Sequence, residues 1–70
     1  MKKNIIEYIV VFISEFSRYH KLSLNDGFNY LNRYKALSFL EEQYDIAHTM
    51  NFSYMIESMS DYCRRNGGNL

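Results

Sequence analysis

The apolar positions of the first twenty residues fall on one side of a helix. At 3.6 residues per turn they form a stripe of five side chains: Ile5, Ile9, Phe12, Phe16 and Tyr19. The opposite side carries the polar residues Lys3, Glu7, Ser14 and Arg18. The β-branched residues between positions 5 and 13 also suit a strand, but they do not alternate with polar residues. The apolar stripe and the polar side opposite it together predict an α-helix over residues 3–21.

Three apolar side chains of this helix lie outside its main stripe. They are Ile6, Val10 and Val11, and they flank the polar strip from both directions. The first helix therefore carries more apolar surface than one buried face needs.

A second helix is expected over residues 24–34. Ser23 is a typical N-cap residue, and Asp26 three positions later resembles a capping box. One stripe of this helix carries the apolar residues Leu24, Phe28 and Leu31, with Tyr34 at its edge. Gly27 disfavours a helix. Its presence is explained either by a close approach of the first helix, which would leave no room for a side chain, or by neutral sequence drift at a position that tolerates glycine.

The third predicted helix, over residues 36–47, has apolar residues on two sides. One face carries Leu37, Leu40, Tyr44 and Ala47, whereas Phe39 and Ile46 point the other way. Three explanations fit this pattern. The helix is sandwiched, or it breaks near residues 43–45, or it presents apolar residues to a partner.

The fourth predicted helix, over residues 52–65, is regular. Its stripe consists of Phe52, Ile56, Met59 and Cys63. Either Thr49 or Asn51 is expected to cap its start, and Gly67 is a typical C′ residue. We expect residues 68–70 to be frayed.

These elements predict an all-α fold, a compact bundle of about four short helices, in a single domain over residues 1–70. The longest apolar run is too short and too interrupted by Glu7 and Glu15 to span a membrane. Nor does a small-residue cleavage site follow it, as a signal peptide requires. A cytoplasmic location and no membrane partner are the resulting expectations.

Composition narrows the possible functions. The net charge is zero, so no overall field attracts the chain to nucleic acid, and a nucleic-acid partner is not expected. Cys63 is the only cysteine, which excludes an intramolecular disulfide and a cysteine-rich zinc site. We expect no cofactor and no metal, because the spacing of His20, His48 and Cys63 matches no zinc signature.

One polar cluster suggests chemistry. Asp45, His48 and Thr49 lie close together in the sequence, and Asp45 could orient His48 as a ligand or general base. No nucleophile accompanies them. The simpler interpretation, which we favour, is a structural one, with His48 at a helix end and Thr49 as a cap. No catalytic residue is predicted, and the chain is expected not to be an enzyme.

Six residues are candidates for contact with a protein partner. They are apolar or aromatic side chains at positions that the helical stripes leave outside the core: Val10, Val11, Tyr30, Phe39, Ile46 and Tyr54. Tyrosine and phenylalanine are enriched at interface cores. A protein-interaction module is therefore the leading hypothesis. The alternatives are a structural homodimer without another partner and, third, a small enzyme or metal protein centred on His48.

The segment Tyr44–Thr49, followed by Tyr54–Glu57 and Tyr62, resembles a family of small bacterial helical proteins of unknown function. Residues 7–12 near the start add to the resemblance, which covers residues 5–66. The chain departs from the family pattern at Ala47, where a leucine is usual, and at Met50-Asn51, which replace Gln-Gly. It also departs around Ser58 and Met59. Members of this family are often encoded beside proteins that resemble ADP-ribosyltransferases. The resemblance thus implies an antitoxin-like protein or an accessory subunit.

Overall fold

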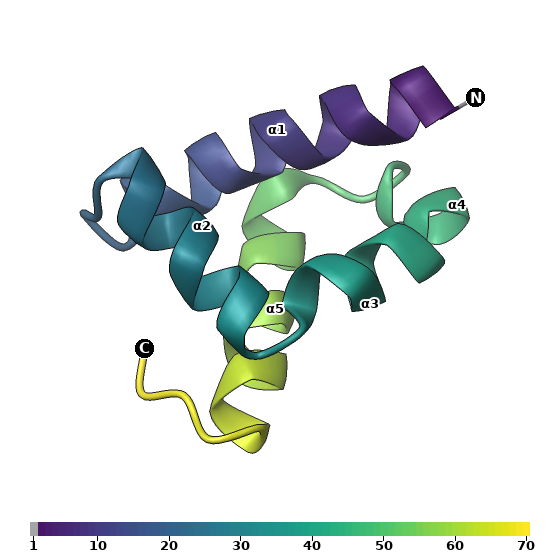
Figure 1. The fold of residues 1–70 in the computed structure, drawn as a ribbon. Coiled ribbons are helices and arrows are strands. Elements are labelled where there is room, and N and C mark those ends of the chain that lie inside the picture. Colours follow the sequence, from purple (N-terminus) through teal and green to yellow (C-terminus); the bar gives the residue numbers. More distant parts are fainter. Residues whose placement is uncertain (1) are drawn as a thin grey trace.

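The computed structural model describes residues 2–70, with side chains from residue 4 onward. Within that range the secondary structure consists of five helices: α1 (Lys2–Tyr19), α2 (Leu24–Arg33), α3 (Ala36–Glu42), α4 (Tyr44–Ala47) and α5 (Phe52–Arg65). They form a globule of 32 × 22 × 19 Å. In Figure 1, α1 crosses one end of the molecule, while α2 and α3 pass in front of α5. The predicted all-α class is confirmed.

The predicted third helix is two helices. Gln43 ends α3 with φ −96° and ψ 11°, and its carbonyl then accepts hydrogen bonds from the first turn of α4, including Ala47 N at 2.8 Å. Of the three explanations for the two-sided pattern, the break at residues 43–45 is therefore correct. Phe39 and Ile46 belong to different helices.

The crossing of α1 and α2 explains the glycine in α2. A Cβ atom at position 27 would overlap Ser17 Oγ and lie 2.9 Å from Ser17 Cβ, so only glycine fits this crossing without a shift. Of the two explanations offered for Gly27, the close approach by the first helix is therefore the correct one. Gly27 and Leu31 consequently form the buried side of α2.

This crossing also changes which side chains of α2 are buried. Leu24 is 58% exposed and Phe28 41% exposed, although both share the predicted apolar stripe with buried Leu31. Gly27 packs closely against Ser17 of α1, whereas the larger side chains at positions 24 and 28 lie outside the buried part of the contact. The apolar stripe of α2 therefore does not coincide with its buried side, which consists of Gly27 and Leu31.

The hydrophobic core lies where α1, α2, α3 and α5 meet. Its fully buried large side chains are Phe12, Phe16, Leu31, Leu40 and Cys63. The stripe of α1 supplies two of them, as expected, but Tyr19 at the helix end is 55% exposed. Burial of such side chains contributes about 1.5–3 kcal/mol each.

The helix ends follow the sequence signals. Ser23 Oγ accepts a hydrogen bond from Asp26 N at 3.0 Å, and Asn51 Oδ1 accepts one from Tyr54 N at 2.8 Å, so Asn51 rather than Thr49 is the N-cap of α5. Gly67 follows α5 with φ +108°, and Gly68 N donates to Cys63 O at 2.8 Å. This is a Schellman cap, which confirms the predicted stop at Gly67.

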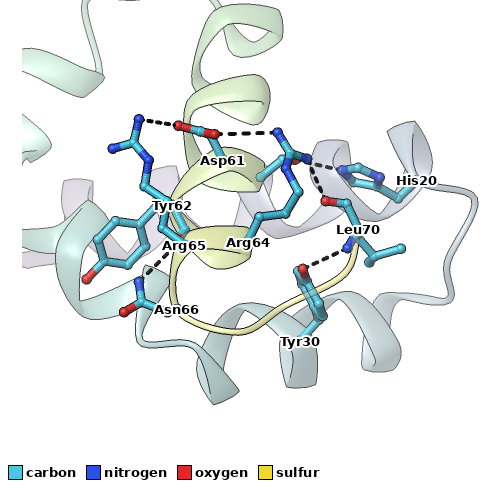
Figure 2. Close-up of polar contacts among 9 residues, drawn as sticks. His20, Tyr30, Asp61, Tyr62, Arg64, Arg65, Asn66 and Leu70 are labelled. Carbon is cyan, nitrogen blue, oxygen red and sulfur yellow. Dashed lines mark hydrogen bonds and ion pairs between the residues drawn. The ribbon is translucent and has the colours of Figure 1, made fainter.

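The last residues of the chain contact α2 and α5. Leu70 N donates to Tyr30 Oη at 3.0 Å, and Arg64 Nη1 donates to Leu70 O at 2.6 Å (Figure 2). The expectation that residues 68–70 are frayed concerns their motion, and it stays a prediction. Across residues 2–70, no helix has the length and apolarity needed to cross a bilayer.

Candidate protein-binding groove

A groove of about 350 Å³ runs between α5 and the segment formed by α3, α4 and the turn after α4. Its lining is mostly apolar and aromatic: Phe39, Ile46, Ala47, Met50, Tyr54, Met55, Met59 and Tyr62. Gln43, Ser58, Asp61 and Arg65 complete it. We call this feature the α4–α5 groove.

The break at Gln43 creates the α4–α5 groove. It ends α3 at Glu42, one turn beyond Phe39. The Phe39 ring stacks on that of Tyr62, with a centroid distance of 4.5 Å and an interplanar angle of 16°. The break also begins a separate single turn, α4, which contributes Ile46 and Ala47 to the lining of the groove.

Exposed side chains form the walls of the groove and buried ones its floor. Ile46 is 60% exposed, Tyr54 56% and Met50 42%, whereas Met55 and Met59 are buried. The exposed fractions are large for such apolar groups. A partner that covered them would remove substantial apolar area from water, at about 25 cal/mol per Å².

All three methionines in the described part of the chain line the α4–α5 groove. A methionine side chain is unbranched and polarisable, so it can adapt to differently shaped partners. Methionine-rich surfaces are typical of proteins that bind apolar faces of several different partners.

One end of the groove is charged. Asp61 pairs with Arg65 at 2.7 Å and with Arg64 at 3.6 Å, as Figure 2 shows. These pairs are largely exposed to solvent, so they contribute little to stability. They provide a polar rim beside an apolar floor, which is the usual anatomy of a protein interface.

The structure brings together three of the six predicted partner-binding residues. Phe39, Ile46 and Tyr54 all line the α4–α5 groove. The other three lie elsewhere: Val10 and Val11 are exposed on α1, and Tyr30 is half-buried against Phe16 and accepts the hydrogen bond from Leu70 N. Half of the predicted residues therefore share one groove, and the other half lie at separate positions outside it.

The residues of the polar candidate site have structural contacts. The His48 ring stacks on that of Tyr44 at 4.7 Å, and Thr49 Oγ1 donates to Ile46 O at 2.6 Å. Asp45 is an exposed residue in the first turn of α4. His48 and Thr49 thus lie at the end of α4, with His48 packed on Tyr44 and Thr49 bonded to the backbone of the same turn, and their role stays a prediction.

A second polar contact was not anticipated from the sequence. His20 Nε2 and Ser60 Oγ lie 2.8 Å apart and join the end of α1 to α5. Burial lowers the pKa of the His20 imidazole, and the nearby Arg64 guanidinium lowers it further. A serine beside a neutral histidine resembles a nucleophile and its base. Ser60 is only 4% exposed, however, so its hydroxyl is shielded from solvent, and the contact links the end of α1 to α5.

Two further titratable groups are shifted by burial. Desolvation raises the pKa of the Tyr8 phenol, with a smaller contribution from Tyr44, and raises that of the Cys63 thiol to about 11. Within the described residues, no cluster of three or more His, Cys, Asp or Glu side chains is placed to hold a metal ion. His20 and Cys63 are instead engaged in packing and in the contact with Ser60.

Comparison with known proteins gives one match. Residues 4–66 match a family described as "Protein of unknown function (DUF3791)". No curated protein and no solved structure matches the chain. The matched range covers nearly all of α1 and every later helix. The chain therefore belongs to the DUF3791 family of proteins of unknown function.

Proposed function

We propose that this chain is a non-enzymatic protein-interaction module that binds its partner in the α4–α5 groove. The observation that carries the proposal is the convergence of Phe39, Ile46 and Tyr54 around a floor of methionines. The three residues come from three helices. Their meeting in one concave surface supports a binding role better than three scattered exposed side chains would.

The groove has the character of a helix-binding site. It is apolar along its length and charged at the Asp61–Arg65 end. An amphipathic helix of the partner would lay its apolar side chains against Ile46, Tyr54 and the methionines. Its flanking polar residues would meet Asp61 and Arg65 at the rim.

The partner that we propose is an ADP-ribosyltransferase-like protein encoded beside the chain. The resemblance to small helical proteins with such neighbours supports this choice. In this proposal the chain acts as an antitoxin-like protein or an accessory subunit, and binding in the groove holds the transferase-like protein in an inactive or assembled state.

The test is co-expression of the chain with that neighbouring protein, followed by co-purification and titration calorimetry. Ile46→Glu places a charge on an exposed groove wall without disturbing the core. We expect it to weaken binding at least about 100-fold, as loss of an interface hot spot does. Val11→Glu is the matched control, because Val11 is an exposed β-branched residue on α1, outside the groove. It should bind like the parent chain.

Helicity and urea midpoint are measured for both variants, since a destabilised chain would also lose binding. A folded Ile46→Glu variant that binds the transferase-like protein with parental affinity would contradict the groove. Absence of any complex between the parent chain and that protein would contradict the choice of partner.

A further inference from the structure

Tyr8 of α1 contacts α4 and α5 together. Its hydroxyl donates a hydrogen bond to Ala47 O of α4 at 3.2 Å. Its ring meets the Tyr44 ring of α4 edge to face, with the centroids 5.5 Å apart, and stacks on the ring of Phe52, the first residue of α5, at 5.6 Å. In Figure 1, α1 lies along the connection from α4 to α5. Tyr8 itself does not line the α4–α5 groove.

Helix α4 depends on contacts of this kind for its position. It consists of a single turn, and an isolated turn of helix is not stable in water. Ala47 is the buried residue of this turn, whereas Asp45 and Ile46 are exposed. Tyr8 contacts both Ala47 and Tyr44, so it reaches the inward side of α4.

The hydrogen bond from Tyr8 satisfies a carbonyl group at a helix end. The last carbonyl groups of a helix have no α-helical partner within it. Ala47 O accepts one hydrogen bond from Met50 N, at 3.0 Å, and the Tyr8 hydroxyl supplies a second. A phenol must be protonated to donate. Burial raises the pKa of the Tyr8 phenol, so the donor form persists at neutral pH.

We propose that Tyr8 is a positioning residue for partner binding, which fixes α4 relative to α5 and thereby sets the spacing of Ile46 and Tyr54 in the α4–α5 groove. This inference rests on the function proposed above. Ile46 directly precedes Ala47, and Tyr54 lies two positions after Phe52. Both exposed groove residues are therefore adjacent in sequence to a residue that Tyr8 contacts.

The proposed role affects the kinetics of binding in a specific way. Without the hydrogen bond, α4 occupies its binding-competent position for a smaller fraction of the time, and the apparent affinity falls by that fraction. The contacts within the complex stay the same. The association rate should therefore fall while the dissociation rate is retained. Substitution of Ile46 differs, because it removes a contact with the partner and mainly raises the dissociation rate.

Amide hydrogen exchange of the free chain tests the positioning of α4. The variant Tyr8→Phe keeps the ring and removes the hydroxyl. The amides of Ala47 and His48, which bond to Gln43 O at 2.8 Å and to Tyr44 O at 3.0 Å, should exchange about fivefold faster, as loss of one hydrogen bond predicts. The amides of a single turn exchange through local opening. A substitution that lowered only the global stability would leave their rates unchanged.

Tyr19→Phe is the matched control. Tyr19 is a tyrosine of the same helix that is 55% exposed, so loss of its hydroxyl should leave the exchange of the α4 amides as in the parent chain. The urea midpoints of both variants show whether they remain folded. Unchanged exchange of the α4 amides in Tyr8→Phe, or an equal increase in Tyr19→Phe, would overturn the positioning role.

Binding kinetics with the transferase-like neighbouring protein test the role in recognition. Tyr8→Phe should lower the association rate by the same factor as it raises α4 exchange, and Tyr19→Phe should bind like the parent chain. Faster α4 exchange with an unchanged association rate would overturn this role. A loss of affinity that fell on the dissociation rate would also overturn it, since Tyr8 would then act in the complex. Absence of any complex with the parent chain would contradict the choice of partner in the proposed function, and the exchange measurement, which needs no partner, would still decide whether Tyr8 fixes α4.

Discussion

Ser17 and Gly27 meet at the point where α1 and α2 cross, with space for one side chain only. The hydroxyl of Ser17 is buried and has no hydrogen-bond partner among the described residues. The crossing thus combines a close backbone approach with an unsatisfied polar atom. Both features lead to measurable consequences.

Gly27→Ala should destabilise the chain by about 1–3 kcal/mol, because the added methyl group would overlap Ser17 Oγ. The steric cost of this overlap should exceed the gain of about 1 kcal/mol that replacing glycine by alanine brings to a helix. Urea unfolding followed by circular dichroism measures the difference. An increase in stability would mean that the two helices separate at no cost.

Ser17→Ala should stabilise the chain by about 1 kcal/mol, since it removes a buried hydroxyl without a partner. Combined with Gly27→Ala, it should recover part of the lost stability, because it removes Ser17 Oγ, the nearest atom to the new methyl group, while Ser17 Cβ stays 2.9 Å from it. Ser14→Ala, at an exposed position of the same helix, is the control. Strict additivity of the two changes would argue against contact between them.

Two lysines adopt a left-handed backbone conformation, which suggests a stabilising change. Lys35, between α2 and α3, has φ +63°, and Lys21, after α1, has φ +57°. Lys35→Gly should raise the melting temperature, since glycine avoids a cost of about 1 kcal/mol for this conformation. Lys35→Ala keeps that cost and serves as the control. Equal melting temperatures for the glycine and alanine variants would exclude this effect.

The contact of His20 with Ser60 should make stability depend on pH. Burial and Arg64 lower the pKa of His20 below its ordinary value of 6.5. The neutral ring is therefore favoured in the folded state. Its contribution is complete above pH 6.5 and is lost as the pH falls through the lowered pKa of the folded state.

Urea midpoints between about pH 7.5 and about pH 5 measure this dependence. His20→Gln should remove a large part of it, and His48→Gln, at an exposed position, should not. An unchanged pH profile in His20→Gln would assign the dependence to other groups.

Cys63 should be unreactive in the folded chain. It is fully buried, and desolvation raises the pKa of its thiol to about 11, so the thiolate is scarce at neutral pH. A thiol reagent should label it slowly, and faster as urea increases the population of open states. Labelling of the native chain as rapidly as the unfolded chain would contradict the burial of this residue.

Local signals along the sequence predicted much of the fold. Ser23, Gly27 and Gly67 each indicate a local geometry through one residue type, and the structure has that geometry at all three. The exposure of Leu24 and Phe28 was not predictable in this way. Helical periodicity places them on the stripe of Leu31, and only the crossing with α1 decides how far that stripe is buried.

The candidate site was predictable as single residues but not as a surface. Phe39, Ile46 and Tyr54 stood out because each lies off its helical stripe. Their convergence depends on the break at Gln43, a residue with no strong helix-breaking tendency. Likewise, His20 and Ser60 are 40 positions apart, and no periodicity within one helix relates them.

The attachment of α4 has a consequence for how partner choice can diverge among related chains. Tyr8 Oη donates to Ala47 O at 3.2 Å, and the Tyr8 ring stacks on Phe52 at 5.6 Å, so α1 holds this single turn from behind. The side chains of Ile46 and Tyr54 face outward from that support. Under the proposed binding role, substitution at these two positions should alter which partners are accepted while folding is preserved, so that recognition would evolve separately from the scaffold.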